Sequence, residues 1–271
     1  MTRIGANLDP EHGLTAADAR RAGFGMVRVV LRDHVDLQPF LAECGTLRLQ
    51  TLGVYAYESS FADGQPAPHE VMAGVYLQRY AGLLDYLQIG NEPDGAPGGS
   101  SWTMMPEDYA ELVMAVAPGW RDHATLVGAG LVSGSLEWPS LLPASVWSQL
   151  DLVAVHPYGR SPDRDATRWR DLPGNFGAVD DLLDGYAGFV EQPLCVTEYG
   201  GRDNEMAPGL LRAYLQEMTA ALIARQSAGR LAFACQFCLS DVMVPTFGAL
   251  DATGALKWAA RGMAALARAH A

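Results

Sequence analysis

The chain lacks the long apolar runs and the basic clusters that mark membrane and nucleic-acid proteins. None of its apolar stretches reaches the roughly 18 residues that a bilayer-spanning helix needs. Lys and Arg number 19 against 31 Asp and Glu, which gives a net charge of −12. Because nucleic acids and anionic membranes attract clustered Lys and Arg, neither is an expected partner. A neutral ligand suits this composition better.

Cysteine is scarce, and several catalytic motifs are missing. The four cysteines are Cys44, Cys195, Cys235 and Cys238. The last two have the spacing of a zinc or redox pair, but residues three apart in an apolar strand point to opposite faces. We therefore expect buried structural thiols. The sequence holds no HExxH, no histidine pair at metal-ligand spacing and no GxSxG, which excludes the metalloprotease and serine hydrolase classes.

The N-terminus also lacks the apolar core of a signal peptide, because residues 1–5 lead at once into a strand-like segment. We expect a cytoplasmic protein on this ground. The 271 residues are 49% hydrophobic and 18% charged, which is ample for one large core. Barrels of alternating strands and helices commonly run to about 250 residues.

Eight apolar runs alternate with segments of helical periodicity. The expected strands cover residues 4–8, 26–31, 52–57, 87–92, 125–131, 152–158, 193–200 and 231–237. The expected helices cover residues 16–22, 37–44, 69–84, 106–117, 141–149, 178–190, 210–225 and 256–269. Thr15 and Asp18 have the spacing of a capping box for the first helix. Continuous apolar strands alternating with helices indicate a buried parallel sheet. We predict an α/β fold: one (β/α)8 TIM barrel domain over residues 1–271.

An open, doubly wound sheet is the alternative fold. Gly128, Ala129 and Gly130 follow the fifth expected strand like the start of a dinucleotide-binding loop. The third glycine of that motif is missing, because position 133 is Ser133. The closed barrel therefore remains the preferred prediction.

Polar side chains gather where the expected strands end. In an eightfold barrel these carboxyl ends carry the active site, and burying polar groups there is costly without partners. The residues at these positions are Arg28, Tyr55, Tyr57, Asn91, Glu92, His156, Tyr158, Glu198, Gln236 and Asp241. Irregular segments at 94–101, next to Trp102, and at 159–174 are expected to surround the cleft, the first as a rim loop and the second as a lid or rim loop.

Glu92 and Glu198 end two apolar strands, and we predict that they face each other across one pocket. Glycoside hydrolysis needs such a pair, one carboxyl protonated and the other ionised. Arg28 and Tyr158 are expected to keep Glu198 anionic. Glu92 has no basic neighbour in the sequence, so a partly desolvated site is expected to hold its proton. Asn91 is expected to hydrogen-bond the sugar hydroxyl beside the reacting carbon.

Strict alternation along a strand sends neighbouring residues to opposite faces. Asn91 and Glu92 can therefore reach the same pocket only if the strand twists or bulges, and Pro93 is the expected place.

These residues resemble a known family. Residues 89–93 (Ile-Gly-Asn-Glu-Pro) and 196–200 (Val-Thr-Glu-Tyr-Gly) look like the acid/base and nucleophile motifs of clan A glycoside hydrolases. Those enzymes are barrels with catalytic glutamates after strands four and seven, where Glu92 and Glu198 fall here. The resemblance extends to Arg28, to His156 and Tyr158, and to residues 247–257. It implies retention of configuration through a covalent glycosyl-enzyme, with no metal and no organic cofactor.

The sequence departs from this family at the end of strand eight. Many relatives carry a tryptophan there, whereas residues 235–239 read Cys-Gln-Phe-Cys-Leu. Phe237 or Gln236 is expected to take its place. Trp102 and Trp138 are candidates for stacking on sugar rings. The residues expected to bind or support the substrate are Arg28, Asn91, His156, Tyr158, Tyr57, Trp102, Gln236 and Asp241.

The prediction is therefore a retaining O-glycoside hydrolase that cleaves an oligo- or polysaccharide by double displacement. A sugar-binding barrel that has lost catalysis is the alternative function. A third interpretation is a barrel module in polysaccharide synthesis or phage assembly. The sequence does not define the sugar, the linkage, endo or exo action, or the oligomeric state.

Overall fold

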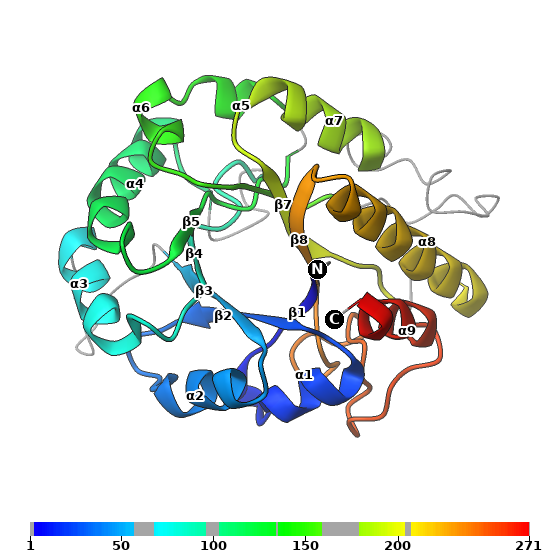
Figure 1. The fold of residues 1–271 in the computed structure, drawn as a ribbon. Helices are drawn as coiled ribbons and strands as arrows, with labels where there is room; N and C mark the ends of the chain where they lie inside the picture. The colour runs from blue at the N-terminus through cyan, green and yellow to red at the C-terminus, as the bar shows by residue number, and fades with distance from the viewer. Residues whose placement is uncertain are drawn as a thin grey trace.

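The computed structural model describes residues 3–56, 68–95, 103–133, 135–158, 179–203 and 207–270. Its eight parallel strands stand side by side in a ring, with the helices outside it (Figure 1). The strands are β1 (Ile4–Asn7), β2 (Met26–Leu31), β3 (Gln50–Tyr55), β4 (Tyr86–Ile89), β5 (Thr125–Val127), β6 (Val153–Val155), β7 (Leu194–Tyr199) and β8 (Leu231–Gln236). Their order is β5-β4-β3-β2-β1-β8-β7-β6. Parallel bridges from Val127 to Leu152 and from Leu131 to Val155 bring β5 beside β6, so the predicted barrel is confirmed.

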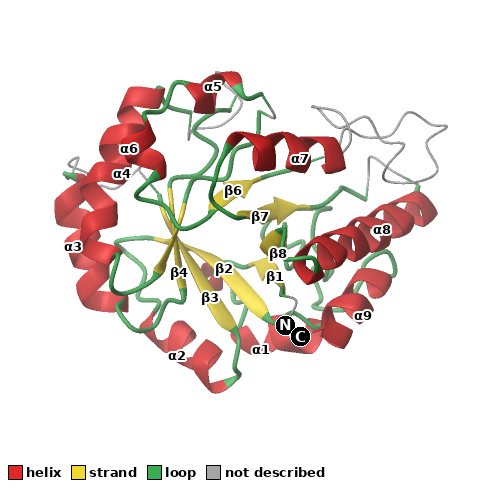
Figure 2. Ribbon diagram, turned by 45° about the horizontal axis from the view of Figure 1, so that its top comes forward, coloured by secondary structure: helices red, strands yellow, loops and turns green. Residues whose placement is uncertain are grey.

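The helices form the outer layer of the barrel (Figure 2). They are α1 (Ala16–Ala22), α2 (Gln38–Thr46), α3 (His69–Tyr80), α4 (Pro106–Trp120), α5 (Glu137–Ser140), α6 (Ala144–Trp147), α7 (Val179–Phe189), α8 (Pro208–Ser227) and α9 (Arg261–His270). The capping box of Thr15 and Asp18 is present at the start of α1, as predicted. Across the segments that the structure describes, no helix is both long and apolar enough to span a membrane.

Two helix predictions were wrong in their bounds. Of the helix expected over residues 141–149, only the short helix α6 (Ala144–Trp147) is present, with Pro143 as its N-cap, and α5 lies wholly before that range. Proline lacks the N–H that a helix interior needs, which explains why the helix begins only after Pro143. The last helix begins only at Arg261. The chain before it returns to the barrel, where Leu256 pairs with Leu250 in an antiparallel bridge.

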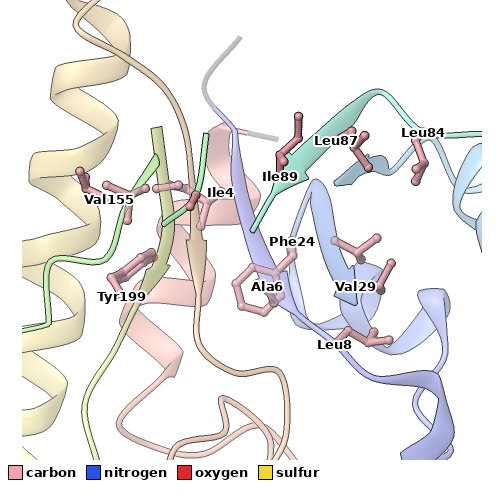
Figure 3. Close-up of a cluster of buried hydrophobic side chains, with 14 of the residues drawn as sticks. Ile4, Ala6, Leu8, Phe24, Val29, Leu84, Leu87, Ile89, Val155 and Tyr199 are labelled. Carbon is pink, nitrogen blue, oxygen red and sulfur yellow. The ribbon is translucent and has the colours of Figure 1, made fainter. Parts of the chain in front are cut away.

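Apolar side chains fill the barrel in two layers. The larger cluster lies between strands and helices, and Figure 3 shows part of it, including Ile4, Val29 and Leu87. A smaller cluster fills the barrel interior: Met26, Leu52, Tyr86, Val127, Leu152, Ala154, Cys195, Phe233 and Cys235. Strand alternation then places Arg28 two residues beyond Met26 and Gln88 two beyond Tyr86, on the same inward face. The side chains inside the barrel are thus apolar in this cluster and polar toward the carboxyl ends of the strands.

The cysteines are buried free thiols, as predicted. Burial raises the pKa of Cys44 and of Cys235 to about 12, so neither is an active thiolate near neutral pH. Cys235 lies in the barrel interior with its Sγ 3.9 Å from the sulfur of Met26.

Gly74 in the middle of α3 offers a stability test. A Cβ placed there meets no other atom within 4 Å. Glycine inside a helix is less stable than alanine by about 0.5–1 kcal/mol, so Gly74→Ala should raise the free energy of unfolding by that amount. Urea denaturation measures it. Gly82 is the matched control: it is equally open, but its φ of 78° disfavours alanine, so Gly82→Ala should lower stability. Equal effects at both positions would contradict this prediction.

Candidate active site

A cavity of about 730 Å³ opens at the carboxyl ends of the strands. Its lining is contributed by strand ends and by the loops that follow them, which is where the active sites of such barrels lie. The lining residues include Asn7, Asp9, Arg28, Val30, Arg32, Val54, Asn91, Glu92, Tyr158, Glu198, Arg202, Phe237 and Phe247. The two glutamates predicted to face each other therefore lie on one cavity.

A bulge in β7 positions Glu198. Between Val196 and Tyr199, three residue steps on β7 match two on β8. The additional residue lets Thr197 and Glu198 both face the barrel interior, where their side chains meet partners from other strands. Tyr199 faces the helix layer instead and hydrogen-bonds Thr219 of α8 at 3.0 Å.

The carboxylate of Glu198 is held from two sides. Arg28 Nη1 donates to Oε1 at 2.7 Å, and the Tyr158 hydroxyl donates to Oε2 at 2.6 Å. The side chain is only 8% exposed. Burial by itself raises the pKa of Glu198, but nearby His156, Arg28 and Tyr158 together outweigh it and hold the pKa below its ordinary value. Burial and the adjacent Glu198 raise the pKa of Tyr158 well above its ordinary value, so this phenol keeps its proton and remains a donor.

Arg28, on β2, is held by residues of three other strands, β1, β4 and β7, or of their ends. Its Nε donates to Gln88 Oε1 at 2.9 Å, and Nη2 donates to Asn91 Oδ1 at 2.6 Å. Nη1 also donates to Asn7 Oδ1. A guanidinium group with this many partners has one orientation, so the positive charge beside Glu198 is fixed in place.

The chain bends so that Asn91 and Glu92 both line the cavity. The bend comes before Pro93, because Gly90 has a φ of 80° and Glu92 a φ of 48°. The left-handed backbone at Glu92 is uncommon for a residue with a side chain. Its N–H donates to the carbonyl of Gly130 at 3.0 Å, which ties the bend to the chain after β5. The predicted distortion exists, but its place was predicted wrongly.

Glu92 has no basic neighbour in the sequence, but the fold brings one to it. His156, fully buried after β6, brings Nδ1 to 2.8 Å from Glu92 Oε1. The same nitrogen is 3.8 Å from Glu198 Oε2, and Nε2 is 2.9 Å from Thr197 Oγ1. Glu92 itself is 20% exposed. An oxygen of Glu92 and an oxygen of Glu198 lie no more than 4.8 Å apart. The buried imidazole therefore lies next to both carboxyl groups.

Glu92, His156 and Glu198 are compact enough to be considered as metal ligands, since one donor atom from each lies within 4.8 Å of the others. The donors are already used, however. Both oxygens of Glu198 accept hydrogen bonds, and Arg28 supplies the positive charge that a cation would bring. The chemistry of this set fits a hydrogen-bonded acid–base site better than a metal site.

Of the two residues expected to take the place of a tryptophan at the end of β8, only Phe237 lines the cavity. Phe237 lines the cavity and packs edge-on against Phe247, with ring centroids 5.4 Å apart, and against Tyr158 at 6.4 Å. Gln236 is buried and does not line the cavity. The prediction that Gln236 meets the substrate is therefore not supported by its position.

The remaining predicted site residues are placed as follows. Asp241 lies outside the cavity lining, because its Oδ1 accepts from the Gly248 N–H and from Lys257, both at 2.8 Å. These two contacts hold the loop after β8 in place, and Asp241 is not positioned to bind a ligand in the cavity. Trp138 packs against Tyr109, with ring centroids 5.6 Å apart, and does not line the cavity. Tyr57, Trp102, the rim segment 159–174 and residues 96–101 of the rim segment 94–101 lie outside the described residues.

Sequence reasoning missed four residues at this site: Asn7, Gln88, Thr197 and Gly130. Asn7 and Gln88 had a usable signal, since each is a polar residue at an inward position of an apolar strand. Thr197 was missed because, with Glu198 facing inward, strict alternation sends its neighbour to the opposite face, and only the bulge lets both face the interior. Gly130 had a misleading signal, as part of a glycine pair that suggested a nucleotide loop.

The comparisons with known proteins identify the fold. No protein-family model matches the chain, and no curated protein does. Solved structures do match. A family 39 glycoside hydrolase from Bacteroides cellulosilyticus WH2 is 18% identical with a TM-score of 0.71, over 98% of this chain and 63% of that one. An exo-β-1,4-mannosidase from Opitutaceae bacterium strain TAV5 is 16% identical with a TM-score of 0.66, over 100% and 60%. This chain thus spans less than two thirds of either of these two structures.

A third match is covered over its whole length. It is a GH128 (subgroup I) endo-β-1,3-glucanase from Amycolatopsis mediterranei, 15% identical with a TM-score of 0.65, with 100% of each chain covered. At these identities the likeness establishes the (β/α)8 barrel and leaves the chemistry to the site itself.

Proposed function

We propose that this protein is a retaining O-glycoside hydrolase, with Glu92 as acid/base and Glu198 as nucleophile. The observation that carries the proposal is the pair of carboxyl groups on one cavity, with oxygens no more than 4.8 Å apart. Retaining enzymes hold the two groups about 5–5.5 Å apart, whereas inverting enzymes need about 6.5–9.5 Å to admit a water. The short separation favours direct attack by one carboxylate.

The first step uses the different surroundings of the two groups. Glu198, kept ionised by Arg28 and Tyr158, attacks the anomeric carbon while Glu92 gives its proton to the departing glycosidic oxygen. Glu92 is the more exposed of the two, so its free oxygen can reach that leaving group. The carbon–oxygen bond to the leaving sugar breaks as the bond to Glu198 forms.

The second step reverses these roles. Glu92, now a carboxylate, removes a proton from water, and the water oxygen displaces Glu198 from the anomeric carbon. Asn91 has its Oδ1 turned toward Arg28, which orients the amide group for a hydrogen bond to the neighbouring sugar hydroxyl. Phe237 and Phe247 supply an apolar wall against which the sugar ring packs.

Two of the structural neighbours are named as a β-1,4-mannosidase and a β-1,3-glucanase. β-Linked mannans and glucans, and the matching aryl β-glycosides, are therefore the first substrates to test. Proton NMR should show that the first sugar released keeps the anomeric configuration of the substrate. An inverted first product would contradict the double displacement. Sugar binding without hydrolysis, by protein that is folded, would favour the inactive carbohydrate-binding barrel.

Tyr158→Phe tests how Glu198 is kept ionised. The change removes a hydrogen bond to the carboxylate, so the pKa of Glu198 should rise toward its ordinary value. Activity requires ionised Glu198, so the acid limb of the kcat/KM–pH profile should move to higher pH, by about one unit for a bond of this type. Tyr186→Phe is the control, because its hydroxyl bonds the Ser135 carbonyl away from the cavity. An unmoved acid limb would contradict the role given to Tyr158.

A further inference from the structure

His156 is enclosed by two residues whose sequence positions gave no hint of a role. Its Nε2 has Thr197 Oγ1 at 2.9 Å, and both side chains are fully buried. Gly130 lies against the same edge of the ring, so closely that a Cβ at this position would stand 2.0 Å from Nε2. No side chain other than hydrogen fits there. One face of the site is therefore shaped around the imidazole.

The groups facing His156 limit which hydrogen-bond pattern is useful. Nδ1 faces Glu92 at 2.8 Å and Glu198 at 3.8 Å, and Tyr158 lies edge-on at 6.2 Å between ring centroids. Both nearest charged groups are carboxyl groups. Nδ1 serves them best as an N–H donor, and Nε2 then meets a hydroxyl that can accept or donate.

Building on the proposed function, we propose that Thr197 and Gly130 are positioning residues that keep His156 as a doubly protonated imidazolium between the two carboxyl groups. Thr197 Oγ1 accepts from Nε2, so that Nδ1 donates to Glu92 Oε1. Gly130 provides the space in which the ring adopts this orientation. The proton for catalysis is then carried on the other oxygen of Glu92, because Oε1 is occupied by His156.

The charge on His156 would act on both catalytic steps. It stabilises the carboxylate that Glu92 becomes after its proton has gone to the leaving group. It also helps Arg28 keep Glu198 ionised, in line with the lowered pKa of Glu198. Because Thr197 precedes Glu198 directly, the bulge in β7 places the nucleophile and the partner of His156 together.

Thr197→Val tests this inference, since valine keeps the shape and removes the hydroxyl. An unpartnered N–H at a buried site is costly, so the imidazole should lose its charge. We expect kcat to fall about tenfold, which corresponds to the loss of one such hydrogen bond, and KM to change less than twofold. The acid limb of the pH profile should move to higher pH. Thr197→Ser should restore kcat and the position of the acid limb. Thr219→Val, which removes a buried hydroxyl that bonds Tyr199, should change neither of these two quantities.

A second measurement does not depend on activity. In protein with ¹⁵N-labelled histidine, both nitrogens of His156 should show the shifts of protonated nitrogen near neutral pH, in wild type and Thr197→Ser. In Thr197→Val, the chemical shift of one of the two nitrogens should change to that of a nitrogen without hydrogen. A wild-type Nε2 without hydrogen would overturn the proposal even if the protein is a glycosidase. Protonated nitrogens in a protein that cleaves no glycoside would instead refute the proposed function and leave His156 as inferred. Gly130→Ala should displace the same signals, and unchanged signals there would overturn the part given to Gly130.

Discussion

Glu198→Ala is expected to lower kcat by roughly 10⁴-fold or more on every glycoside that the wild type cleaves. The variant has no group that can form the covalent intermediate, and loss of a nucleophile typically costs this much. Steady-state kinetics on an aryl glycoside measures the loss. A variant that retains full activity on any substrate would contradict the assignment of Glu198.

Folding must be controlled in that experiment, because Glu198 is the buried partner of Arg28. Removing one member of a buried ion pair typically costs about 3–5 kcal/mol. Glu198→Gln is the matched variant, since its amide oxygen can still accept from Arg28. Both variants should be inactive, and Glu198→Gln should melt at the higher temperature. If Glu198→Gln melts like the wild type and is inactive, the loss of activity is chemical rather than structural.

Added azide separates loss of the nucleophile from general damage. Azide can occupy the space left by the Glu198 carboxylate in the alanine variant and attack the anomeric carbon from the same face. The carbon–nitrogen bond forms as the bond to an activated aryl leaving group breaks. This single displacement should give a glycosyl azide of inverted configuration, which NMR identifies. A glycosyl azide of retained configuration would place the nucleophile elsewhere.

The fold could be predicted from local patterns alone. Apolar runs of strand length alternate with helical periodicity, and eight such pairs in 271 residues suit only a few architectures. The capping box of Thr15 and Asp18 could be predicted in the same way. The late start of α6 after Pro143 had a signal too, because proline interrupts helices. It was missed because the apolar residues on either side continue the pattern of one helix.

The site was predictable only in part, for a physical reason. Strand ends converge in a barrel, so Glu92, Glu198, Arg28 and Tyr158 could be expected to lie together. The contact of His156 with Glu92 joins residues 64 apart in the sequence, and it depends on backbone detail. Neither the left-handed backbone at Glu92 nor the bulge before Tyr199 follows from residue alternation.

Glu92→Ala is the second variant with a large expected effect. How the loss of activity depends on the leaving group is more informative than the size of the loss. Without the proton donor, cleavage of poor leaving groups should slow by roughly 10²- to 10⁴-fold, the usual contribution of general acid catalysis. A dinitrophenyl glycoside needs no proton to leave, so its first step should stay fast. The second step lacks its base, so a burst of dinitrophenol followed by slow turnover should appear in stopped-flow traces.

Azide should accelerate that slow phase and give a product of retained configuration, because it attacks the covalent intermediate on Glu198 after one inversion. The configuration is thus opposite to that expected for Glu198→Ala, which distinguishes the two roles within one reaction. Glu111→Gln is the matched control, because Glu111 is exposed on α4, does not line the cavity and is not part of the pair. A loss that is equal for good and poor leaving groups would show that Glu92 is not the proton donor.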